Sequence, residues 1–84
     1  MFQPVFRGDD YSYFFEEKTE RYLLYRKVSN IQVILEDEDA RNFQDYVEMI
    51  NNDPLPNKKG RTEKTIRIYF SFFNFEPLQH LIDA

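Results

Sequence analysis

The sequence has no cysteine and no tryptophan, and it has only two glycines among its 84 residues. Without cysteine the chain can form neither disulfides nor thiolate metal sites. Gly8 and Gly60 lie in no phosphate-binding pattern, so a glycine-rich nucleotide loop is not predicted. No run of 18 apolar residues occurs, which predicts that no helix spans a membrane and that no membrane is a partner.

A targeting signal is also missing from the start of the sequence. The first seven residues lack the basic start and the apolar stretch that are typical of a signal peptide. Together with the absence of cysteine, this favours a cytoplasmic location. The length predicts a single domain over residues 1–84, and the net charge of −4 is typical of an ordinary soluble surface.

Aromatic side chains are what the sequence has in excess. Nine Phe and six Tyr make up 18% of the chain. A domain of this size has a thin core, and each such ring can bury about 150–250 Å². The rings are therefore needed either to complete the core or to form an interface.

Strand patterns dominate the first half of the chain. Residues 1–10 are interpreted as an N-terminal arm that ends in a turn, followed by strands over residues 11–16, 21–28 and 31–35. The clearest alternation is later, where Ile66, Ile68, Phe70 and Phe72 are separated by single residues, and it predicts a strand over residues 66–73.

The clearest helix is predicted to begin after Glu36, with Asp37 as its N-cap. Its apolar stripe is Ala40, Phe43, Val47 and Ile50. Residues 52–64 are predicted to be a long basic loop, and a short helix is predicted after Glu76-Pro77. The element order β-β-β-α-β-α predicts an α+β fold, in which a small antiparallel sheet has its main helix across one face and a short C-terminal helix.

The sequence offers no convincing catalytic or metal-binding constellation. His80 is the only histidine, and no nucleophile or carboxylate pairs with it in a recognisable arrangement. The Asp37-Glu38-Asp39 run is explained by helix capping, and a calcium loop starting there would need glycine where Asn42 stands. We therefore expect no catalytic residue, no metal and no cofactor.

A basic cluster beside aromatic residues suggests nucleic-acid binding as an alternative function. Phosphate attraction combined with ring stacking is what single-stranded nucleic acid requires. A solvated charged loop explains the same residues, and the net negative charge argues against the alternative. The candidate residues in segment 58–67 are Lys58, Lys59, Arg61, Lys64 and Arg67.

The surplus of rings favours a protein-binding function. Because the predicted strands have aromatic residues on both faces, two helices would leave some rings uncovered, and Tyr and Phe are enriched at interface centres. The candidate contacts are Tyr13, Tyr22, Tyr69 and Phe73. The partner is expected to be another protein, with self-association through the sheet as one route.

These patterns together predict a small non-catalytic protein-binding module acting through an aromatic sheet surface. Its size suits a regulator or an inhibitor, such as the small antagonists that phages and mobile elements direct at host proteins. A lower-ranked hypothesis is nucleic-acid mimicry by an acidic surface. Its residues would be Asp9, Asp10, Glu16, Glu17 and Glu36 to Asp39.

Overall fold

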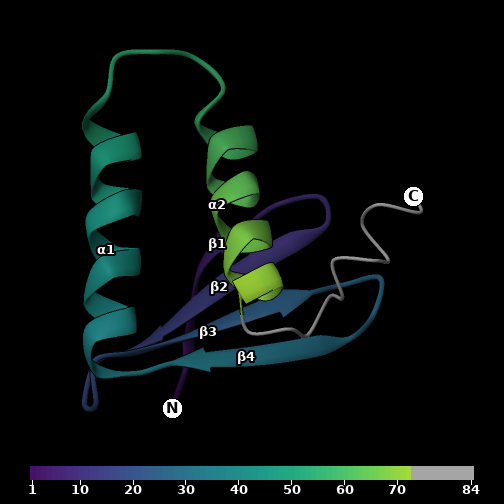
Figure 1. Cartoon of the computed structure of the whole chain (residues 1–84), viewed down its shortest axis with the longest axis vertical. Coiled ribbons are helices and arrows are strands. Elements are labelled where there is room, and N and C mark those ends of the chain that lie inside the picture. Colours follow the sequence, from purple (N-terminus) through teal and green to yellow (C-terminus); the bar gives the residue numbers. More distant parts are fainter. Residues whose placement is uncertain (73–84) are drawn as a thin grey trace.

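The computed structural model describes residues 1–72, in which four strands are followed by two helices (Figure 1). The strands are β1 (Gln3–Arg7), β2 (Tyr11–Glu16), β3 (Arg21–Arg26) and β4 (Ile31–Leu35), and the helices are α1 (Asp37–Asn52) and α2 (Lys58–Phe72). The fold is therefore α+β, with the order β-β-β-β-α-α. Phe73 and the helix predicted after Pro77 lie outside the described residues.

The four strands form one antiparallel sheet in the order β1-β2-β3-β4, so each strand pairs with its neighbours in the chain. The turns between β2 and β3 and between β3 and β4 each end in a residue with left-handed backbone, Glu20 with φ 56° and Asn30 with φ 54°. Asn tolerates this conformation better than Glu does. The β1–β2 pairing contains an irregularity between Pro4 and Phe6.

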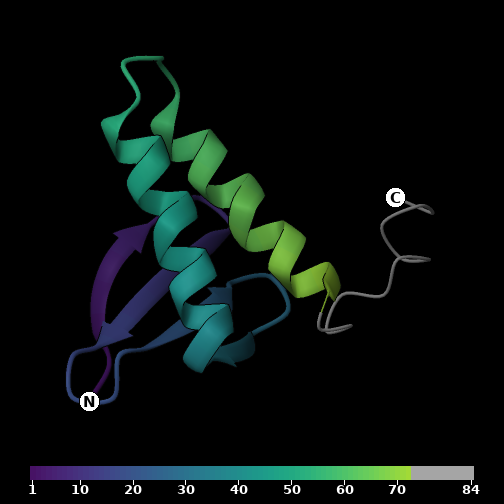
Figure 2. The ribbon, with the colours of Figure 1, turned by 60° about the vertical axis from the view of Figure 1, so that its left-hand side comes forward.

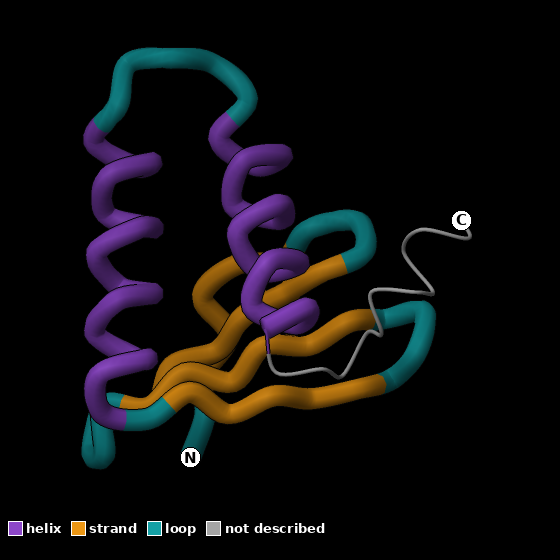
Figure 3. Tube along the Cα trace, viewed as in Figure 1, coloured by secondary structure: helices purple, strands orange, loops and turns teal. Residues whose placement is uncertain are grey.

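The two helices lie side by side on one face of the sheet, and neither of them covers the other face (Figures 2 and 3). Side chains alternate along β2, so Tyr11 and Tyr13 point towards the helices. On β3, Tyr22 and Leu24 do the same. We refer to this as the inner face of the sheet, and to the opposite face as the outer face.

The ring of Phe43 on α1 is at the centre of the core and is fully buried. Three tyrosine rings surround it, with centroids 5.0 Å away for Tyr13, 5.1 Å for Tyr22 and 5.5 Å for Tyr69. Two of these contacts are edge-to-face and that of Tyr22 is tilted, and aromatic pairs of this kind add about 0.5–1.5 kcal/mol each beyond the area they bury. The core therefore connects the sheet to both helices through one aromatic cluster.

Three predicted elements are different in the structure. The arm predicted over residues 1–10 contains a strand, β1, which supplies the fourth strand of the sheet. Residues 66–72 of the strand predicted over residues 66–73 are instead part of α2, and the predicted loop 52–64 is mostly the first half of that helix. The antiparallel sheet and the helix after Glu36 were predicted correctly.

The sequence of α2 contains a helical spacing of apolar residues in addition to the alternating pattern that predicted a strand. Thr62, Ile66, Tyr69 and Phe70 lie at i, i+4, i+7 and i+8, and all four are buried. The side chain of Asn57 accepts a hydrogen bond from the backbone N–H of Gly60 at 3.3 Å, which caps the helix start. Burial of this stripe against the sheet outweighs the strand preference of the Ile and Phe residues.

The start of α1 also differs in detail from the prediction. The N-cap residue is Glu36, which makes no side-chain capping hydrogen bond, and Asp37 is the first helical residue. Asp37, Glu38 and Asp39 still place negative charge in the first turn, where the helix dipole favours it.

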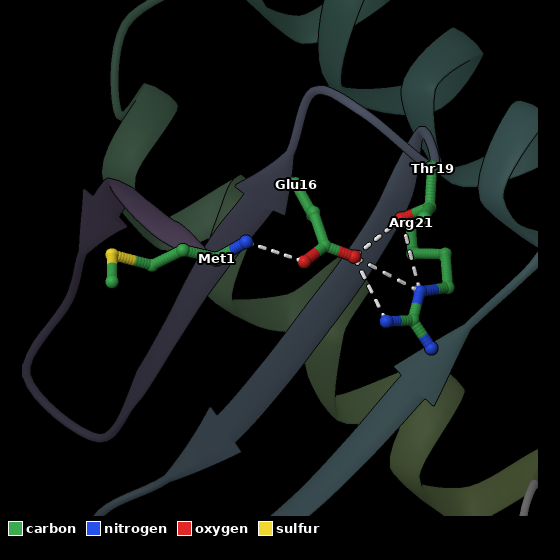
Figure 4. A network of polar contacts seen from close by, with 4 residues as sticks. All are labelled: Met1, Glu16, Thr19 and Arg21. Atoms are coloured by element: carbon green, nitrogen blue, oxygen red, sulfur yellow. Dashed lines mark hydrogen bonds and ion pairs between the residues drawn. The ribbon is translucent and has the colours of Figure 1, made fainter.

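A polar network ties the chain start to the β2–β3 turn (Figure 4). The carboxylate of Glu16 accepts hydrogen bonds from the N-terminal amine of Met1 at 2.6 Å, from the Thr19 hydroxyl, and from Arg21 Nη2 at 2.8 Å. These donors, the Met1 amine first among them, lower the pKa of Glu16 from its ordinary value of 4.5 to about 2. The Arg21 guanidinium also lies 5.3 Å from the centre of the Phe2 ring.

Candidate functional site

The tyrosines predicted as partner contacts lie in the core. Tyr13 is 6% exposed, Tyr22 is 7% exposed and Tyr69 is 9% exposed. Tyr13 and Tyr22 alternate onto the inner face, and Tyr69 belongs to a helix rather than to a strand. Burial raises the pKa of all three phenols. They therefore do not form an exposed aromatic sheet surface, and the fourth predicted contact, Phe73, lies outside the described residues.

The basic residues proposed for nucleic acid are on α2 rather than on a loop. Three of them have partners within the chain. Lys58 Nζ donates to the carbonyl of Asn51 at 2.8 Å, and Lys59 Nζ is 2.9 Å from a carboxylate oxygen of Asp9.

The third is Arg61, whose Nη1 is 3.2 Å from Asp53 Oδ2 and whose Nη2 donates to the carbonyl of Leu55 at 3.0 Å. Lys64 and Arg67 are exposed on the same helix. The structure therefore uses three of the five basic side chains to hold the α1–α2 loop and the β1–β2 turn, and their charge is partly compensated.

An apolar groove lies between α1 and α2 on the side that faces away from the sheet. Its volume is about 810 Å³. Four of its lining residues are large apolar side chains that are nonetheless exposed: Tyr46 by 51%, Met49 by 60%, Ile68 by 47% and Phe72 by 79%. An exposed apolar surface of this kind is typical of an interaction site.

Acidic and polar side chains surround this apolar floor. Asp39 and Asp45 come from α1, together with Asn42, and Thr65 comes from α2. Tyr69 also lines the groove, while its ring packs edge-on against Phe43. We refer to the nine lining residues as the helical groove: Asp39, Asn42, Asp45, Tyr46, Met49, Thr65, Ile68, Tyr69 and Phe72.

Helical spacing places the groove residues on two facing stripes. On α1, Asn42, Tyr46 and Met49 follow one another at intervals of four and three, directly beside the buried stripe of Phe43 and Val47. On α2, Ile68 and Phe72 are four residues apart. The apolar character of Tyr46 and Met49, on a second face of α1, was a signal in the sequence that the prediction did not use.

The described residues contain neither a metal cluster nor a membrane-crossing helix. No group of three or more His, Cys, Asp or Glu side chains in residues 1–72 is arranged to hold a metal ion. Neither α1 nor α2 has the length and apolar character that crossing a membrane would need.

The fold and the groove together define an α+β protein with a four-stranded antiparallel meander, one face of which carries a helical hairpin with an apolar outer groove. Comparison with protein-family models, with curated proteins and with solved structures finds no match.

Proposed function

We propose that this protein binds another protein by accepting a segment of it in the helical groove. The supporting observation is that Tyr46, Met49, Ile68 and Phe72 gather in one groove although each is about half exposed or more. Leaving these side chains in water gives the fold nothing, whereas a partner that covers them gains roughly 25 cal/mol for each Å² of apolar surface buried. Aromatic residues and Met are also enriched at protein interfaces.

The shape of the groove favours a helical segment. Two antiparallel helices present a groove along their length, and an amphipathic helix fills such a groove with side chains at i, i+3, i+4 and i+7. A volume of about 810 Å³ accommodates several such side chains. The small number of polar groups at its border would set the orientation of the segment.

The charge of the border favours a basic partner. Asp39 and Asp45 line the groove, and the chain has a net charge of −4. Opposite charges on the partner would steer association and fix its register. The proposed ligand is therefore an amphipathic helix whose apolar stripe is flanked by Lys or Arg.

A random peptide library of 16 to 20 residues, displayed on phage, tests this proposal. Selection on the wild-type chain should enrich peptides with apolar residues at helical spacing and basic flanks. Met49→Asp and Ile68→Asp should each weaken binding of a selected peptide at least tenfold in fluorescence anisotropy. Ile34→Asp, at an equally exposed position on the sheet, is the matched control and should leave the affinity unchanged.

The charge reversal Asp45→Lys sharpens the test, because it should weaken the binding of basic peptides and strengthen the binding of acidic ones. The proposal fails if no peptide is enriched. It also fails if selected peptides bind Met49→Asp and Ile68→Asp as tightly as they bind the wild-type chain. Circular dichroism of each variant confirms that the fold is retained.

A further inference from the structure

The two edges of the sheet are protected against further strand pairing to very different degrees. β1 contains Pro4, which has no N–H to donate, an irregular register between Pro4 and Phe6, and the charged Arg7. These are devices by which natural sheets prevent pairing at an edge. β4 has the sequence Ile-Gln-Val-Ile-Leu, without proline, glycine or charge.

β4 also pairs with β3 in unbroken register, from Tyr22 opposite Leu35 to Arg26 opposite Ile31. In an antiparallel ladder, alternate residues of an edge strand direct their N–H and C=O groups away from the sheet. Within residues 1–72, β4 has no second strand neighbour. The helix α1 rises from the end of β4 instead of running along its outer side (Figures 1 and 3).

An apolar row on the outer face leads to this open edge. Phe14 on β2 is opposite Leu23 on β3, and Leu23 is opposite Ile34 on β4. Ile34 is 45% exposed. Within residues 1–72, the row therefore ends at β4 with Ile34, which has a cross-strand neighbour on β3 and none on the side away from β3.

The nearest charged residues before and after β4 in the chain are opposite in sign, and the one before it, Lys27, lies directly after the end of β3, where its backbone N–H donates to the carbonyl of Asp10 and its charge acts on Asp9. Four acidic residues, Glu36 to Asp39, follow the strand directly, and Lys27 lies in the turn that precedes it. An antiparallel neighbour with the same sequence would place its own Lys27 turn near these acids, and its own acids near the Lys27 turn. A parallel neighbour would bring like charges together.

We propose that β4 is a self-association edge, at which β4 of a second copy adds antiparallel to give a continuous eight-stranded sheet. The arrangement has two-fold symmetry, so the same patch serves both copies. We place Ile34 opposite Ile34 of the second copy, because this register extends the apolar row across the interface. Val33 is then opposite Leu35, and Gln32 is opposite Glu36.

A pair of five-residue strands is a small interface, so weak, concentration-dependent association is expected. Sedimentation velocity of the full chain from about 1 μM to 1 mM should show a mass that rises from monomer to dimer. Ile34→Lys should weaken dimerisation at least tenfold, because it places two lysines side by side. Ile68→Lys, in the helical groove, is the matched control and should leave the dimer intact.

The lack of cysteine in the chain allows a direct test of the register. Ile34→Cys should cross-link rapidly to a covalent dimer on mild oxidation, because directly opposite residues in a sheet lie within disulfide reach. Val33→Cys should cross-link much more slowly, because its partner is Leu35 and its side chain is buried. Rapid cross-linking of Val33→Cys instead would overturn the proposed register.

Three outcomes overturn the proposal as a whole. The first is a monomer at all concentrations, and the second is a dimer that Ile68→Lys disrupts and Ile34→Lys does not. The third is a monomer whose β4 amides are nevertheless protected from hydrogen exchange, which would assign the edge to another part of the same chain. The first and third results do not bear on peptide binding in the helical groove, so the two proposals can fail separately, whereas the second would assign the groove to a second copy.

Discussion

The helical hairpin has two sides that use similar side chains for different purposes. On the side facing the sheet, Phe43 and Phe70 are buried among tyrosine rings. On the opposite side, Tyr46 and Ile68 are about half exposed in the helical groove. The comparison teaches that aromatic content alone does not identify an interface, because the first set stabilises the fold and only the second set is available to a partner.

The largest effect on stability is expected from removal of the central Phe43 ring, and it tests the division between the buried and the exposed side of the hairpin. Phe43→Ala should lower the free energy of unfolding by about 3–5 kcal/mol, because it leaves a cavity among Tyr13, Tyr22 and Tyr69. Tyr46→Ala, three residues along the same helix, should change it by less than about 0.5 kcal/mol. Urea denaturation measures both changes in the free energy of unfolding. If Phe43→Ala does not fold, the milder truncation Phe43→Leu can be compared with Tyr46→Ala instead. Equal losses at the two positions would contradict the division.

A smaller effect is expected where α2 is attached to the sheet by polar contacts. Glu63 Oε1 accepts hydrogen bonds from the backbone N–H groups of Asp10 at 2.9 Å and of Tyr11 at 3.3 Å. A Cβ at position 8 would overlap that oxygen. Gly8→Ala should therefore displace the carboxylate and cost about 1–2 kcal/mol in urea denaturation.

A double-mutant cycle identifies the cause of this loss. In a Glu63→Ala background the added methyl group meets no carboxylate, so Gly8→Ala should then cost much less. If Gly8→Ala costs the same in both backgrounds, the carboxylate contact is not the reason.

The smallest effect concerns the polar network at the start of the chain, remote from both sides of the hairpin. The folded-state pKa of Glu16 is lowered to about 2 from 4.5, so its carboxylate stabilises the fold above about pH 4.5. This contribution should be lost as the pH falls from about 4.5 towards 2. Glu16→Gln should consequently flatten the acid side of the profile of Tm against pH, measured by circular dichroism.

Glu17→Gln is the neighbouring control and should keep the wild-type slope. A profile for Glu16→Gln as steep as that of the wild-type chain would show that other carboxylates account for the acid sensitivity.

The elements from residue 11 to the end of α1 could largely be predicted from the sequence because each is defined by a short-range pattern, whereas β1 was not predicted. The predicted strands 11–16 and 31–35 coincide with β2 and β4, and the helix after Glu36 is α1. Segment 66–72 could not be assigned in this way, because Ile66, Ile68 and Phe70 fit an alternating pattern while Ile66, Tyr69 and Phe70 fit a helical one. The choice between them depends on packing against a sheet that no local pattern describes.

The candidate site was less predictable than the fold for the same reason. Tyr13 and Tyr22 were selected because they are aromatic residues on strands, yet which face of a strand is buried depends on where the helices pack. With α2 in place of the strand predicted there, two helices cover the inner face, and both tyrosines lie beneath them. Tyr46 and Met49 become a surface only because α2 lies beside α1.

The segregation of all four strands before both helices has a consequence for synthesis on the ribosome. The meander through Leu35 is translated before any residue of α1, so its inner face, with Tyr11, Tyr13 and Tyr22, emerges without a cover. Nascent chains that expose apolar surface and open strand edges are prone to aggregation. The interval between translation of β4 and of Phe43 should thus be the period in which the growing chain depends most on chaperones.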